Sequence, residues 1–147
     1  MLRHELDVLA LPEEEIELER EMLEGLERAA ALATGIDANG LPVVETGHRV
    51  VGAERCHFSA PASMPDDPLQ PSGRVLFTAR RAIFAGGGAT IGLGWHTVGE
   101  AGHSDRDLVI ATVDRQRFLR FRCNSFADAM CAAVIARRLS MQARRSL

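Results

Sequence analysis

The sequence contains no lysine and no tyrosine, and it has a single tryptophan among its 147 residues. All 17 basic residues are therefore arginines, a bias that we ascribe to coding composition and not to chemistry. The absence of lysine excludes the Gly-Lys-Ser/Thr ending of a phosphate-binding loop. The run Gly86-Gly87-Gly88 is accordingly predicted to be the tip of a β-hairpin.

Cysteines are few, and they do not form a pattern. Cys56, Cys123 and Cys131 are odd in number and lie far apart, which argues against a disulfide framework and agrees with a reducing compartment. Cys56 with the neighbouring His57 is the nearest approach to a metal motif, but it lacks the close pairs of known zinc sites. We therefore expect no metal site and no cofactor.

Long apolar runs are also missing. No stretch approaches the roughly 20 apolar residues of a membrane-spanning helix. Residues 1–10 lack the apolar core of a secretory signal, so we expect a cytoplasmic protein. With 46% hydrophobic and 25% charged residues, the chain has the composition of one ordinary globular domain.

Charge is distributed unevenly along the chain. Residues 1–70 hold 15 acidic residues and 5 arginines, whereas residues 71–147 hold 5 acidic residues and 12 arginines. Such a split is typical either of two complementary surfaces that meet within the fold or of a basic binding face beside an acidic one. We favour the first interpretation.

An amphipathic helix is predicted over residues 12–34, because Pro12 and the three glutamates after it are typical of a helix start. Gly35 is expected to end it in a left-handed conformation. Residues 1–40 would then form a helix and turn ahead of a domain over residues 41–147. The apolar face of this helix must be covered by the domain or by a second, antiparallel copy, and its candidate interface is Leu18, Met22, Leu23 and Leu26.

From residue 43 onward, short β-rich runs replace the helical pattern. Strands are predicted over residues 49–59, 73–78, 81–86, 90–97, 107–113 and 117–123, with a proline-rich loop over residues 60–72. Ser125 with Asp128 resembles the capping box of a second helix. The arginines near its end are explained by compensation of the helix dipole; they are Arg137, Arg138, Arg144 and Arg145.

The segment over residues 73–84 resembles the strand-turn-strand pattern of GRAM and bacterial PH-like domains. The matching residues are Gly73, Val75, Phe77, Thr78, Arg81 and Phe84. This resemblance implies an α+β, mainly β fold, in which a strongly bent antiparallel sheet forms a partly open barrel capped by the C-terminal helix. The N-terminal amphipathic helix is an addition to it. One core should contain Phe77, Phe84, Trp95, Phe121 and Phe126.

No local signature of catalysis is present, because no nucleophile lies in a known motif with its base. We therefore expect a non-catalytic chain, and an enzyme with a dispersed site is the remote alternative. Nucleic-acid binding would need a basic face with several stacking aromatics, which this sequence lacks.

Two functions remain. The first is a protein-interaction module, whose partner binds in an apolar groove or at a strand edge beside the C-terminal helix, or is a second copy paired through the N-terminal helix. The alternative, implied by the resemblance, is a peripheral domain that binds anionic lipid or phosphoinositide. Asp66 and Asp67, however, lie in the loop where lipid-binding members carry basic residues. The candidate binding surface is Arg74, Arg80, Arg81, Phe118, Arg120 and Arg122.

Overall fold

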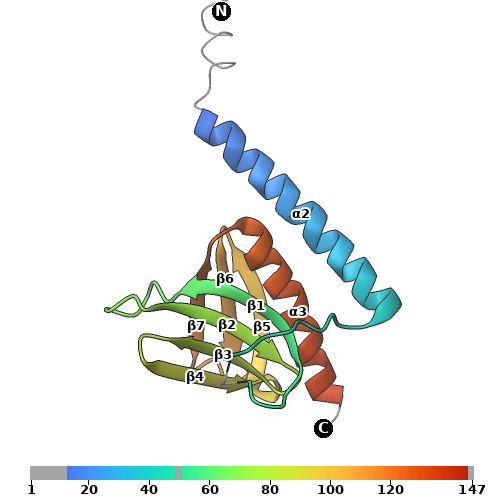
Figure 1. Ribbon diagram of the computed structural model, residues 1–147, viewed down its shortest axis with the longest axis vertical. Coiled ribbons are helices and arrows are strands. Elements are labelled where there is room, and N and C mark those ends of the chain that lie inside the picture. Colours follow the sequence, from blue (N-terminus) through green and yellow to red (C-terminus); the bar gives the residue numbers. More distant parts are fainter. Residues whose placement is uncertain (1–12, 49–50, 146–147) are drawn as a thin grey trace, which may run out of the picture.

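The computed structural model describes residues 13–48 and 51–145, and within them two long helices flank an antiparallel sheet of seven strands (Figure 1). The helices are α2 (Glu13–Asn39) and α3 (Phe126–Arg145), and neither is apolar enough to cross a membrane. The strands are β1 (Cys56–Ser63), β2 (Ser72–Thr78), β3 (Arg81–Gly86), β4 (Ala89–Gly94), β5 (Val98–Ser104), β6 (Asp107–Thr112) and β7 (Phe118–Cys123).

The strand order is β4-β3-β2-β1-β7-β6-β5, so β4 and β5 are the two edges and the sheet does not close into a barrel. Every paired neighbour is antiparallel. The predicted class, α+β and mainly β with one helix at each end of the chain, is confirmed. The sheet curves around α3, whose buried side fills its concave face (Figure 1).

Four of the five aromatic residues predicted to share a core do so. The edge of the Trp95 ring meets Phe77 at a centroid distance of 5.0 Å, and Phe84 stacks on Phe121 at 5.7 Å. Phe126 is buried as well, but it lies at the start of α3, where the guanidinium of Arg106 covers its ring.

Three strand predictions need correction. β1 begins at Cys56 and runs to Ser63, into the predicted loop; residues 49–50 of the predicted strand lie outside the described residues. The predicted strand over residues 90–97 ends at Gly94, and Trp95–Thr97 form a short 3-10 helix. Val98–Ser104, for which no strand was predicted, is β5.

Helix α2 continues beyond Gly35, its predicted end. It stops at Asn39, and Gly40 has a φ of +83° and donates its N–H to the carbonyl oxygen of Ile36 at 2.7 Å. Gly40 therefore adopts the left-handed conformation expected of Gly35. Ile36 is 4% exposed and belongs to the core, so burial of this side chain stabilises the additional turn of α2.

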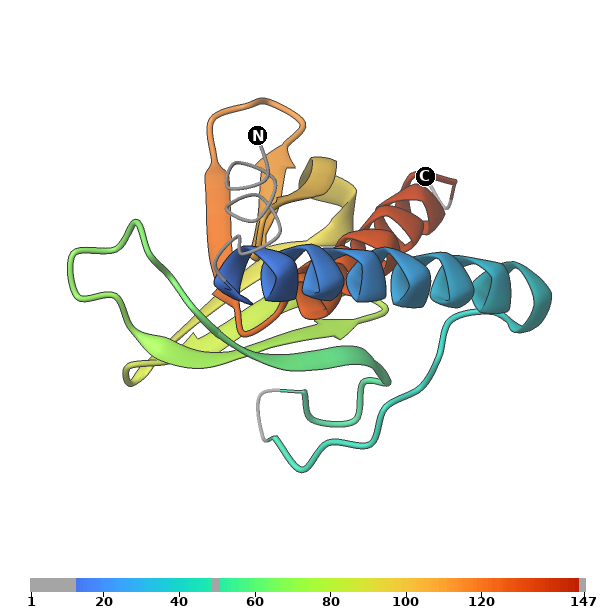
Figure 2. The same cartoon turned by 90° about the horizontal axis from the view of Figure 1, so that it is seen from above.

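Helix α2 lies against α3 at the side of the molecule (Figures 1 and 2). The contact is narrow and close. A Cβ on Gly25 would lie 3.0 Å from the sulfur of Met130 and 3.1 Å from the backbone nitrogen of Ala127, so only glycine fits there without a shift. The residues predicted as the interface of this helix remain 41–61% exposed; they are Leu18, Met22, Leu23 and Leu26.

Glu21 fixes α2 at the N-terminus of α3. Its carboxylate accepts hydrogen bonds from the backbone N–H of Phe126 at 2.9 Å and from Nη2 and Nε of Arg106 at 2.8 and 3.0 Å. The bond from Arg106, followed by that from Phe126, outweighs burial and lowers the pKa of Glu21 below its ordinary value of 4.5. A carboxylate at this point also complements the positive end of the α3 dipole.

The uneven charge of the chain is resolved within the fold. Among the described residues, four ion pairs join an acid of the first 70 residues to an arginine of the remainder: Glu21–Arg106, Asp37–Arg138, Glu54–Arg81 and Asp66–Arg120. These pairs agree with the interpretation of two complementary surfaces that meet within the molecule, and they leave the arginines of residues 115–117, 137 and 144 outside it.

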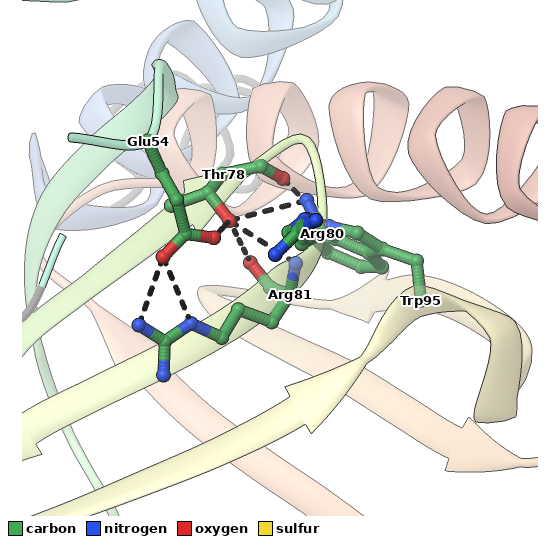
Figure 3. A network of polar contacts seen from close by, with 5 residues as sticks. All are labelled: Glu54, Thr78, Arg80, Arg81 and Trp95. Atoms are coloured by element: carbon green, nitrogen blue, oxygen red, sulfur yellow. Dashed lines mark hydrogen bonds and ion pairs between the residues drawn. The ribbon is translucent and has the colours of Figure 1, made fainter. Parts of the chain in front are cut away.

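The turn between β2 and β3 is held by a polar network around Thr78 (Figure 3). The Thr78 hydroxyl accepts the backbone N–H groups of Arg80 and Arg81 at 3.2 and 3.1 Å and donates to Oε1 of Glu54 at 2.9 Å. Oε2 of Glu54 accepts Nη2 of Arg81 at 2.9 Å, and the indole N–H of Trp95 donates to the carbonyl oxygen of Thr78 at 2.8 Å. Thr78 and Arg81, two residues of the strand-turn-strand pattern over residues 73–84, therefore stabilise the turn between β2 and β3.

Truncation of the central aromatic pair should be costly. Phe121→Ala removes a ring that is 4% exposed and stacked on Phe84, so we expect the free energy of unfolding in urea to fall by about 3 to 5 kcal/mol. Phe118→Ala is the matched control on the same strand: that ring is 63% exposed, and the change should stay within about 0.5 kcal/mol. A loss below about 1 kcal/mol for Phe121→Ala would contradict its place in the core.

The Glu21 contact should make stability depend on pH in acid. The pKa of Glu21 is lower in the folded chain than in the unfolded chain, where it is about 4.5. As the pH falls from 4.5 through the pKa of the folded chain, the unfolded chain binds more protons at Glu21, and the free energy of unfolding decreases. Glu21→Gln should be less stable than the parent chain at pH 7, with a difference that shrinks on acidification. Urea unfolding over a pH series measures this. Glu24→Gln, at an exposed position on the same helix, should leave the pH dependence unchanged.

Candidate functional site

Strand β5 is an edge of the sheet and lies beside α3. Two of its seven residues, Gly99 and Gly102, are glycines. A Cβ on Gly99 would lie 3.0 Å from the Cα of Val113, and the pairing with β6 is irregular between Val98 and Glu100. At these two positions no side chain covers the strand, and groups from α3 reach the backbone of β5.

Two arginines of α3 reach this backbone. Arg137 donates Nε to the carbonyl oxygen of Ala101 at 2.7 Å, and Arg144 donates Nη2 to those of Val98 and Gly99 at 2.8 and 2.7 Å. The two arginines are seven residues apart, so they lie on one face of the helix, two turns from each other. Because the carbonyl of Ala101 points toward α3, the alternation of an antiparallel ladder places the backbone groups of His103 on the same free edge.

A groove follows β5 at this place; we call it the β5–α3 groove. It consists of two adjoining hollows of about 720 and 750 Å³, which share a lining of Gly99, Glu100, Ala111, Phe118 and Arg144. Its apolar lining comes from β6, β7 and α3 and includes Val109, Ala111, Phe118 and Met141. The rings and methyl groups of Phe118 and Met141 are largely exposed, so apolar surface is available to a ligand.

The groove has an excess of positive charge. It is lined by Arg115, Arg117, Arg137 and Arg144, whereas Glu100 is the one acidic residue that lines it among those the structure describes. Glu100 lies 3.7 Å from Arg115, and both side chains are highly exposed, so their attraction is weak. The arrangement suits a ligand that is anionic and partly apolar.

Of the six residues predicted as a binding surface, Phe118 lies in this groove. Arg80 and Arg81 lie instead at the turn between β2 and β3, where Arg81 pairs with Glu54. Arg74 lies on β2 and donates Nε to the hydroxyl of Ser59 at 3.0 Å. The structure therefore does not bring these arginines to one site.

The two arginines predicted on β7 also have partners. Arg122 donates Nε to Asp107 at 2.9 Å, and Arg120 pairs with Asp66 and approaches the same Asp107 at 3.7 Å. These bonds raise the pKa of Arg122, first through the hydrogen bond and then through the charge of Asp107. Much of the cationic face predicted for β7 is thus engaged within the molecule.

Apart from Phe118, sequence reasoning missed the residues that shape the groove. Arg137 and Arg144 were assigned to dipole compensation, and the stretch over residues 98–104 was not recognised as a strand. The sequence contained two signals for this site. Arg137 and Arg144 are seven residues apart on a predicted helix, and residues 98–104, which follow Trp95, contain two glycines. Among the described residues, no group of three or more His, Cys, Asp or Glu side chains is placed to hold a metal ion.

No family model and no curated protein matches this chain. Among solved structures it is similar to the C-terminal domain of an unknown protein from Leishmania infantum, at 10% sequence identity, a TM-score of 0.47, and coverage of 80% of this chain and 97% of that one.

Proposed function

We propose that this chain is a non-catalytic interaction module of the PH-like type that binds an extended, acidic segment of a partner protein in the β5–α3 groove. One observation carries the proposal: an edge strand, which pairs with β6 on one side and with no further strand of the described sheet on the other, borders a groove that combines an apolar lining with four arginines. The antiparallel sheet with its C-terminal helix and the Gly73–Thr78–Arg81 signature support the PH-like type.

The edge strand favours an extended ligand. A peptide that adds to a sheet edge gains main-chain hydrogen bonds along its length, and its alternate side chains enter pockets on the two sides. On β5 the backbone groups of Ala101 and His103 face the free edge, and the ring of Phe118 lies close enough to receive an apolar side chain. This arrangement gives both affinity and selectivity.

The arginines favour an acidic ligand. Carbonyl oxygens of β5 that now accept Arg137 and Arg144 would accept peptide N–H groups, and the released guanidinium groups would bind peptide carboxylates. Charge-assisted pairs of this kind are roughly twice as strong as neutral hydrogen bonds. The exchange leaves no backbone group of the edge without a partner.

Binding can be tested with a synthetic peptide of about ten residues that alternates Glu and Val, and with a Lys/Val peptide of the same length as its control. We expect the acidic peptide to shift the amide NMR signals of β5, around Gly99, Ala101 and His103, and to bind less tightly as salt is added. The basic peptide should leave these signals unchanged.

Two sets of variants sharpen the test. Arg137→Gln with Arg144→Gln should weaken binding of the Glu/Val peptide about tenfold, the equivalent of about 1.4 kcal/mol, while the matched control Arg138→Gln, which faces Asp37, should not. Ala101→Pro removes a backbone donor from the free edge and should weaken binding as well. Shifts confined to other strands, or equal losses in the control, would contradict the proposal.

The lipid alternative gives a different result. Sedimentation with vesicles that contain phosphatidylserine would retain the protein at moderate salt, and Arg120→Glu with Arg122→Glu would abolish that retention. If this outcome is found and the Glu/Val peptide has no effect on β5, the binding surface is formed by Arg120 and Arg122 of β7 and not by the β5–α3 groove.

A further inference from the structure

Helix α2 has a second apolar surface, which is turned away from the side on which Gly25 meets α3. It repeats with heptad spacing, since Ile16, Leu23 and Ala30 are seven residues apart and Leu26 and Ala33 each follow after three. Leu23 and Leu26 are 61% and 52% exposed. We call this surface the outer stripe; it consists of Ile16, Glu19, Leu23, Leu26, Ala30 and Ala33.

The outer stripe is too apolar for a solvent-facing side. A helix that already packs one side, here through Gly25, normally carries polar residues on the other. Figures 1 and 2 show α2 at the periphery, with one long side against α3 and the opposite side open. The interface that the sequence predicted around Leu23 and Leu26 therefore remains accessible in the folded chain.

We propose that the outer stripe pairs with the outer stripe of a second copy of this chain, antiparallel and about a two-fold axis. Leu23 then faces the partner's Leu26, and Leu26 faces the partner's Leu23. In the same register Ile16 meets the partner's Ala33 at each end, so apolar layers lie at the centre and at both ends of the seam. The contact is symmetric and closed, as is usual in homodimers.

The charges on the stripe select the antiparallel arrangement. Glu19, the one polar member of the outer stripe, faces the partner's Ala30, whose small side chain leaves the carboxylate a path to water. In a parallel pair Glu19 would face Glu19, and the acidic N-terminal turns of the two helices would lie side by side. The antiparallel pair instead places each acidic half beside the C-terminal half of the other helix, which is much less acidic because it holds Glu27, Asp37 and Arg28.

A flanking pair fixes the register. Arg20 and Glu27 lie next to the outer stripe on the same side, seven residues apart, and both are exposed. The proposed register sets Arg20 beside the partner's Glu27, and the symmetry repeats this contact at the other end. Two pairs of opposite charge thus form in the antiparallel dimer, whereas a parallel dimer would bring Arg20 near the partner's Glu15.

Sedimentation equilibrium of the full chain from roughly 1 to 200 μM measures the pairing. We expect a reversible dimer. Leu23→Glu, at an exposed position in the central layers, should raise its dissociation constant at least about tenfold, while Leu69→Glu, at an 88% exposed residue outside α2, should leave it unchanged. A monomer over the whole range, or an equal loss in both variants, would overturn the proposal.

Charge exchange tests the direction of the helices. Arg20→Glu and Glu27→Arg should each weaken the dimer, and the double variant should restore it, because the two reversed charges meet again. A parallel dimer would respond to Arg20→Glu but not to Glu27→Arg, and the double variant would not recover. The thermal unfolding of each variant should match that of the parent chain at concentrations where the parent chain is monomeric.

Discussion

The alanine-rich surface of α3 is the constraint on which both sides of the molecule depend. Ala129, Ala132, Ala133 and Ala136 are at most 1% exposed, so the helix is covered on several sides at once. Small side chains allow α3 to lie deep in the curved sheet, while Gly25 of α2 approaches the same helix at Ala127 and Met130. Larger residues at these positions would overpack the core and displace either the sheet or α2. The groove and the outer stripe are positioned by this packing.

The fold was predictable where local signals agree with tertiary structure. Alternating apolar residues and turn residues located β3 at its observed bounds and β7 within one residue. β5 was missed because glycines weaken strand propensity, and its extended state comes from pairing with β6. The end of β1 was not predicted, because a proline such as Pro61 cannot donate a hydrogen bond to a neighbouring strand. On the side of β1 that faces β7, the pairing covers Ala62 and Ser63, so Pro61 lies just outside it.

The candidate site was predictable only in part, because its arginines act through tertiary contacts. Phe118 was found from its outward position on β7, and it lines the groove. Arg81 and Arg120 looked like a free cationic surface, since their partners Glu54 and Asp66 come from segments far away in the sequence. Arg137 looked like an ordinary charge near a helix end, because no local pattern reveals that its guanidinium reaches the carbonyl of Ala101.

Two consecutive arginines, Arg137 and Arg138, connect α3 to β5 on one side and to α2 on the other. Arg137 binds the backbone of β5, whereas Arg138 pairs with Asp37 near the end of α2. Adjacent residues on a helix point about 100° apart, so one turn of α3 connects the edge strand on one side to α2 on the other. Because the alanines of the preceding turns, from Ala129 to Ala136, are buried, α3 has little freedom to shift. A ligand in the groove would therefore bind on one side of α3, and a second copy would bind through α2 on the other side, without competing for the same residues.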